Sequence, residues 1–142
     1  MSEQITALPW ELPVPSTSLL NEPTIEELRP GLVLNIEYEA DSEFVKTPRA
    51  GIIRQRLFFE GVVAFKCTNS LLCDVEIINL AYDKLADLGQ TEWLSSLQTQ
   101  PEWLRKELSL DAIRHVAIFF DEGPCHEFIC RGISISEEFL PR

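Results

Sequence analysis

The segment from Leu32 to Glu39 alternates between apolar and polar side chains, and this alternation restricts the fold more than any other feature of the sequence. In an extended strand successive side chains point to opposite faces, so Leu34, Ile36 and Tyr38 share one face. The other face carries Asn35, Glu37 and Glu39. One apolar and one polar face are typical of a strand in an antiparallel sheet that covers a core with one side only.

More strand pattern is expected after a loop. Residues 40–51 contain Asp, Ser, Pro and Gly, and a strand should begin near Ile52. From Arg56 to Cys67 the large apolar residues favour odd positions, but Gly61 interrupts the pattern. Gly61 marks either a bulge in one long strand or the turn of a tight hairpin, and the sequence leaves both open.

Thr68-Asn69-Ser70 predicts a three-residue turn between this strand and the next one. Such a turn places Cys67 opposite Leu71 and builds one continuous apolar face, and the second strand should end near Ile78. The polar face of this hairpin would carry Lys66, Asp74 and Glu76.

Three helices are predicted between residues 79 and 108. The first begins at Asn79, which can cap it, and ends at Leu88 before Gly89. Residues 91–98 and 101–108 form two shorter helices, the second of which starts with a proline that suits a first helical position.

The last predicted element is a β-hairpin. An apolar strand over residues 114–120 is followed by the turn Asp121-Glu122-Gly123-Pro124 and by a strand from Cys125 to about Ile135. The predicted fold class is α+β, a single domain with an antiparallel sheet of five or six strands and two or three helices inserted before the C-terminal β-hairpin. A β-sandwich with a helical insertion is the alternative.

The N-terminal part of the chain is rich in proline. Five of the nine prolines fall in the first thirty residues, where they oppose both helix interiors and sheet ladders. We therefore divide the chain into a proline-rich arm, residues 1–30, which belongs to the same unit, and an α+β domain, residues 31–142. The arm is expected to be mostly irregular, with one helical turn over residues 23–28. A flexible arm and a packed arm both fit the sequence.

Length and composition describe an ordinary globular domain. The chain has 142 residues, of which 45% are hydrophobic and 25% charged. No apolar window approaches the roughly 18 residues that a spanning helix needs, and the N-terminus lacks a secretory signal, so no membrane segment and a cytoplasmic location are expected. The four cysteines are too few for a disulfide framework and are expected to be free thiols.

The formal net charge of −11 narrows the class of partner. Such a charge repels the phosphates of nucleic acids and the anionic headgroups of membranes, so neither is an expected partner. Electrostatics instead favours a basic protein, although the same charge also serves solubility.

The sequence offers no motif for a metal or a cofactor, and we assign no catalytic residue. The run from His126 to Cys130 differs from the zinc motif His-Glu-x-x-His in its second ligand, and on a predicted strand the two side chains lie roughly 13 Å apart. Cys67 and Cys73 lack the spacing of a zinc knuckle, and no glycine-rich phosphate loop occurs.

One strand pairing suggests a chemically active alternative. If Phe120 pairs with Cys125 across the turn, His115 becomes the cross-strand neighbour of Cys130. An imidazolium beside a thiol lowers the thiol pKa and favours the nucleophilic thiolate. The alternative function is therefore a small enzyme or ligand-binding protein with a pocket near His115, His126 and Cys130, although such a pair also suits simple packing.

The leading hypothesis is a non-enzymatic acidic protein-binding domain. Carboxylates cluster in residues 37–43, on the polar face of the predicted sheet and in the hairpin turn, and their convergence would attract a basic partner. The candidate partner-binding residues are Glu37, Glu39, Asp41, Glu43, Asp74, Glu76, Asp121 and Glu122. The sharpest form of the hypothesis is an inhibitor or immunity-type protein, by analogy of charge and size with small acidic inhibitors of basic nucleases. An exposed edge strand would also permit a homo-oligomer.

Overall fold

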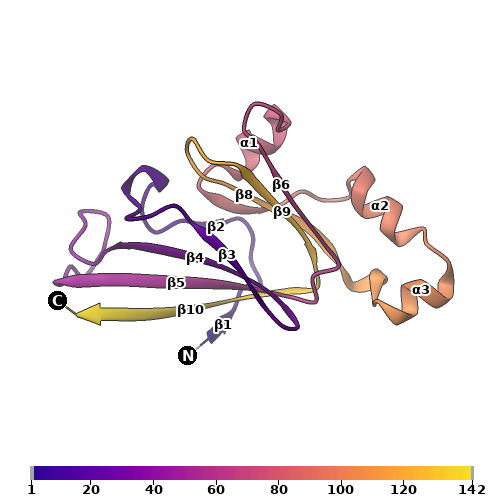
Figure 1. Cartoon of the computed structure of the whole chain (residues 1–142), viewed down its shortest axis with the longest axis horizontal. Helices are drawn as coiled ribbons and strands as arrows, with labels where there is room; N and C mark the ends of the chain where they lie inside the picture. The colour runs from indigo at the N-terminus through magenta and orange to yellow at the C-terminus, as the bar shows by residue number, and fades with distance from the viewer. Residues whose placement is uncertain (1, 142) are drawn as a thin grey trace.

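Two antiparallel sheets dominate the computed structural model, which describes residues 2–141 (Figure 1). Within these residues each sheet has five strands, and three α-helices lie between the strands in the sequence. The predicted α+β class with antiparallel strands is confirmed, and the presence of two sheets corresponds to the sandwich alternative.

The first sheet has the strand order β1-β10-β5-β4-β3. Its strands are β1 (Ser2–Gln4), β10 (Gly132–Pro141), β5 (Gly51–Glu60), β4 (Gly31–Glu39) and β3 (Thr24–Leu28).

The second sheet has the strand order β2-β7-β8-β9-β6. Its strands are β2 (Trp10–Glu11), β7 (Lys84–Asp87), β8 (Arg114–Phe119), β9 (Cys125–Cys130) and β6 (Ala64–Thr68).

The main hydrophobic core lies between the inner faces of the two sheets. Leu34 and Ile36 belong to β4, the strand with alternating apolar and polar side chains, and they are almost fully buried in this core. Phe59 of β5 stacks on Phe128 of β9 with ring centroids 3.8 Å apart, so the two sheets meet through aromatic packing.

Three α-helices follow β6 in the described residues, and the first two of them pack on the outer face of the second sheet. The three are α1 (Val75–Ala81), α2 (Glu92–Gln98) and α3 (Glu102–Glu107), and the last two confirm the helices predicted for residues 91–98 and 101–108. Helix α1 packs over Ala117, Phe119 and Cys125, whereas Leu94 of α2 packs near Ile129. The outer face of the first sheet instead carries charged side chains such as Arg54 and Arg56.

Two of the connections between the sheets lie side by side at a bulged corner. Strand β5 of the first sheet leads through Gly61 into β6 of the second, and β9 leads through Arg131 back into β10. The pairing Glu60↔Gly132 gives way to Ala64↔Ile129, so one strand has an extra residue at the corner. Gly61 has φ +64°, a conformation that costs glycine little, and of the two interpretations the bulge is the closer one.

The hairpin predicted at residues 68–70 is wrong. After β6 the chain turns into α1, and the partner of β6 is β9. The side chain of Asp74 caps α1 by accepting a hydrogen bond from the Glu76 backbone N–H at 2.9 Å, and this local bond prevails over the β-propensity of the following residues. Asp74 and Glu76 therefore lie at a helix start, not on a sheet face.

The helix predicted for residues 79–88 is also wrong. Helix α1 ends at Ala81, and Asp83 has φ +55°, which a continuing right-handed helix does not allow. Residues 84–87 then form β7, where Leu85 enters the main core. The prediction was wrong because Leu85 of β7 and the neighbouring Leu80 and Leu88 happen to recur at helical spacing.

The proline-rich arm is packed and contributes strands to both sheets. Residues 24–28 form the edge strand β3, not the predicted helical turn, because their backbone pairs with β4. Ile5 and Val14 are buried, and a 3-10 turn at Ser16–Ser18 precedes β3. The arm is therefore part of the walls around the core.

Candidate functional site

The alternative pocket predicted near His115, His126 and Cys130 does not form. The β8–β9 turn pairs Phe119 with Cys125, one residue away from the predicted register. His115 therefore lies opposite Ile129 on the outer face of the second sheet, whereas His126 and Cys130 point to the inner face.

Cys130 lies in the main core and lacks the properties of a nucleophile. Burial raises the pKa of its thiol to about 12, so the thiol is protonated at neutral pH. The cysteine that pairs across strands with His126 is instead Cys67 of β6, which is exposed. The sequence did not predict that Cys67 and His126 are neighbours, because their contact requires β6 to lie beside β9.

His115 belongs to a buried polar network on the outer face. Its Nε2 lies 2.9 Å from Glu127 Oε1, and its Nδ1 lies 2.7 Å from Thr91 Oγ1. A carboxylate only accepts, so Nε2–H donates to Glu127, and in the neutral imidazole Nδ1 then accepts from the Thr91 hydroxyl. Glu127 also lies 3.7 Å from the ammonium of Lys66, which sits over the Trp93 ring.

This network fastens α2 to the second sheet. The Thr91 hydroxyl is the N-cap of α2 and accepts a hydrogen bond from Leu94 N–H at 3.2 Å. The order of hydroxyl, imidazole and carboxylate in the network resembles a nucleophilic triad. The Thr91 hydroxyl, however, already forms hydrogen bonds with both Leu94 N–H and the His115 imidazole. We therefore interpret the network as structural.

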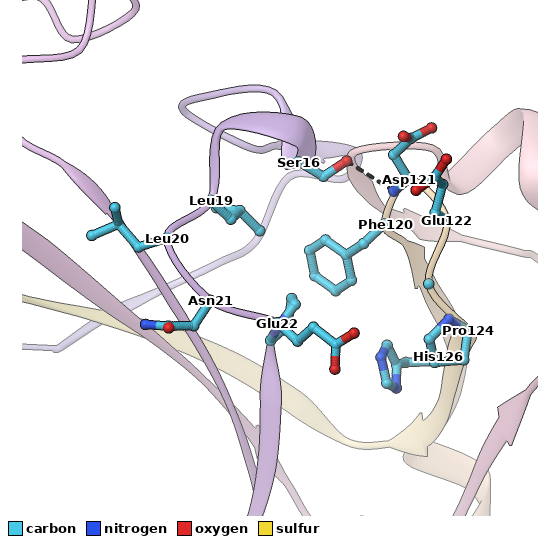
Figure 2. Close-up of a pocket in the computed structure, with 12 residues that line it drawn as sticks. Ser16, Leu19, Leu20, Asn21, Glu22, Phe120, Asp121, Glu122, Pro124 and His126 are labelled. Atoms are coloured by element: carbon cyan, nitrogen blue, oxygen red, sulfur yellow. Dashed lines mark hydrogen bonds between the residues drawn. The ribbon is translucent and has the colours of Figure 1, made fainter.

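A pocket opens between the arm and the turn that joins β8 to β9, and we call it the tip pocket (Figure 2). It encloses about 420 Å³. Two segments far apart in the sequence line it: Ser16, Leu19, Leu20, Asn21, Glu22 and Pro23 from the arm, and Phe120, Asp121, Glu122, Gly123, Pro124 and His126 from the hairpin.

Hydrogen bonds fix residues 16–20 of the arm to both sheets, beside the turn between β8 and β9. Ser16 N–H donates to Asp83 Oδ2 at 3.1 Å, and the Ser16 hydroxyl accepts from Asp121 N–H at 2.9 Å (Figure 2). At the other end of the segment, Leu20 N–H donates to the Glu37 carbonyl at 2.9 Å. The pocket wall is thereby fixed to both sheets.

His126 forms the buried side of the tip pocket. It is 6% exposed, and its Nδ1 is buried without a hydrogen-bond partner. Its ring lies between Phe65 and Phe120, with centroid distances of 6.4 and 5.9 Å. Burial lowers the pKa of His126 below its ordinary value of about 6.5, so the imidazole is neutral at pH 7 and keeps one acceptor nitrogen.

Three carboxylates surround the mouth of the pocket. Glu22, Asp121 and Glu122 are exposed, and no ion pair joins them to a basic side chain within residues 2–141. In Figure 2 the Glu22 carboxylate extends toward the His126 side of the pocket. The Tyr82 hydroxyl donates to Asp121 at 2.8 Å, and this bond raises the pKa of Tyr82. None of the described lining residues is Lys or Arg.

The predicted acidic set does not converge on one surface. Only Asp121 and Glu122 line the tip pocket. Glu37 pairs with Arg54 at 3.2 Å on the outer face of the first sheet, and Glu39 ends β4. The remaining members lie in the loop after β4 and at the start of α1: Asp41, Glu43, Asp74 and Glu76.

Glu22 is the pocket carboxylate that the sequence reasoning missed. A single Glu between Asn21 and Pro23 carries no signal of its own. The sequence leaves both a flexible and a packed arm open, so it does not show that Leu19 and Leu20 bring this part of the arm to the hairpin turn.

No group of three or more His, Cys, Asp or Glu side chains within residues 2–141 is arranged to hold a metal ion. No helix in this part of the chain has the length and apolar character to cross a membrane.

No protein-family model matches the chain, and comparisons with curated protein sequences and with solved structures find no significant match. Function must therefore be argued from the geometry of the site.

Replacing His126 with Phe should stabilise the protein by about 1 kcal/mol at pH 7.5, because it removes a buried nitrogen without a partner. The gain should grow at pH 5.5. The lowered pKa of His126 means that the unfolded chain binds the proton more readily, so the wild type loses stability as the pH falls below about 6.5. Urea unfolding of both proteins at the two pH values measures the margin, and a margin that shrinks in acid would contradict the assigned burial.

Replacing Thr91 with Val should destabilise the protein by about 1–2 kcal/mol, because it removes the cap of α2 and the hydrogen bond to His115 together. Thr91→Ser keeps the hydroxyl and serves as the matched control. Equal urea midpoints for the two variants would show that the hydroxyl does not anchor α2.

Proposed function

We propose that this chain is a non-enzymatic acidic binding domain whose partner is a basic protein, and that the partner binds at the tip pocket. An inhibitor or immunity-type role toward that protein is the most specific form of the proposal. The observation that carries it is the group formed by the carboxylates of Glu22, Asp121 and Glu122 around the buried imidazole of His126. None of the three forms an ion pair with a basic side chain in the part of the chain that the structure describes.

The distribution of basic side chains supports this choice of surface. Arg54 lies between Glu37 and Glu138, and Arg56 pairs with Glu26, so carboxylates on the first sheet are partly neutralised. No such pairing occurs at the mouth of the tip pocket within residues 2–141. Because unpaired surface charges attract opposite charge most strongly, this mouth is favoured for a basic partner.

The chemistry around the pocket favours binding over catalysis. Cys130 is buried with a raised thiol pKa, and His115 is engaged in the network with Glu127 on the other face of the sheet. The pocket combines an acceptor, carboxylates and apolar walls, which are the elements that recognise a cation. A basic surface that presents donors would find complementary groups there.

The test compares two variants that each remove three negative charges. Glu22→Gln, Asp121→Asn and Glu122→Gln together change the tip pocket, whereas Glu102→Gln, Glu107→Gln and Asp111→Asn change the surface around α3, at a distant end of the molecule (Figure 1). The probe is a decalysine peptide, measured by calorimetry at low and moderate salt.

The tip variant should bind decalysine about tenfold more weakly than the control variant and with a flatter salt dependence, since the three nearby carboxylates together contribute on the order of 1–2 kcal/mol after screening by salt. Equal weakening by the two variants would mean that only the net charge matters, and the proposed binding surface would be wrong. Capture from a native lysate with the wild type and both variants then identifies the basic partner, which only the tip variant should fail to retain.

A further inference from the structure

Resting on the proposed function, we propose that the tip pocket receives a single lysine or arginine side chain of the partner. The aliphatic stem lies against the apolar walls, and the charged head reaches the His126 side of the pocket, beside the Glu22 carboxylate, where an N–H of the head donates to the imidazole (Figure 2). Asp121 and Glu122 at the mouth attract the cation as it enters. This assigns the pocket a ligand of defined chemistry.

His126 is the first reason for a donor ligand. A buried polar group without a hydrogen bond costs about 1–3 kcal/mol, so nearly all such groups in proteins are paired. The Nδ1 atom of His126 is buried without a partner, and the residue faces a pocket. In the tautomer that carries its proton on Nε2, Nδ1 is an acceptor, and a donor that reaches it from the pocket relieves this cost.

The walls of the pocket fit an aliphatic stem. Leu19, Pro23, Phe120 and Pro124 line it and present carbon surface along its depth. Lysine and arginine bury their methylene groups on such surface while the charged end stays near water and counter-charges.

The carboxylates favour a cation over a neutral or an anionic ligand. Glu22 comes from the arm, whereas Asp121 and Glu122 come from the hairpin turn, so negative charge approaches the mouth from two sides (Figure 2). A neutral amide would gain the hydrogen bond to His126 but not this attraction, and an anion would be repelled. Both observations together therefore select a basic side chain.

Three capped tripeptides test the inference: Gly-Lys-Gly, Gly-Arg-Gly and Gly-norleucine-Gly, whose norleucine has an apolar stem without the charge. Each is titrated into the ¹⁵N-labelled protein at pH 7.5 while the imidazole nitrogens of His126 and the backbone amides are followed by NMR. The two cationic peptides should produce saturable shifts at His126 and at residues 120–123, with dissociation constants on the order of 1 mM. The norleucine peptide should produce none of these shifts.

Two variants assign the contacts. His126→Phe, which keeps the ring packing but removes the nitrogens, should weaken binding of the lysine peptide at least about threefold, the loss of one hydrogen bond. The three-carboxylate variant of the tip pocket should weaken it about tenfold, and the control variant around α3 should leave it unchanged. Backbone amide spectra of each variant verify that the fold is retained.

The outcomes separate this inference from the proposed function. If decalysine binding depends on the tip carboxylates but the tripeptides do not shift His126, the partner binds across the surface and no side chain enters the pocket, which overturns the inference alone. Equal shifts with the norleucine peptide would overturn it as well. Tripeptide binding at His126 combined with decalysine binding that ignores the tip carboxylates would keep the cation pocket and overturn the protein-binding proposal.

Discussion

The packing of Phe59 against Phe128 joins the two sheets, and the rest of the structure depends on this contact. The ring centroids are 3.8 Å apart, and the buried aliphatic side chains of both sheets surround them. Near this contact the backbone crosses from sheet to sheet at Gly61 and Arg131, so the sheets are covalently and sterically closed at that corner. The turn between β8 and β9 lies at the opposite end of β9 from Arg131, where the arm spans the two sheets.

The two histidines have different surroundings because they lie on opposite faces of the second sheet. His115 lies on the outer face, where Thr91 and Glu127 provide partners for both ring nitrogens. His126 lies on the inner face beside the tip pocket, where the Nδ1 atom has none. The arm encloses His126 without supplying a hydrogen bond, and its carboxylate at Glu22 adds negative charge to that of the hairpin. A pocket of this kind costs stability unless a ligand fills it.

Local patterns predicted a good part of the fold, and long-range pairing accounts for what they missed. The alternation of apolar and polar residues in β4 indicates which of its side chains are buried. Helices α2 and α3 have residues at their starts that favour a helix, so all three elements could be predicted from the sequence. Helix α1 was missed because its N-cap, where the Asp74 side chain accepts from Glu76 N–H, and its packing on the second sheet outweigh the strand propensity of its residues. The hairpin register was wrong by one residue because it depends on the turn geometry. The tip pocket joins residues about a hundred positions apart, which no local pattern encodes.

We propose that negative potential concentrates at the tip pocket, because no basic side chain within residues 2–141 forms an ion pair with its carboxylates. Nitroxide cosolutes measure this directly, since a cationic and a neutral nitroxide of similar size enhance proton relaxation in proportion to their local concentration. The ratio of the two enhancements should be highest at the backbone amides of residue 22 and residues 121–123, and clearly lower around α3. A ratio that is the same at the tip pocket and around α3 would contradict the account.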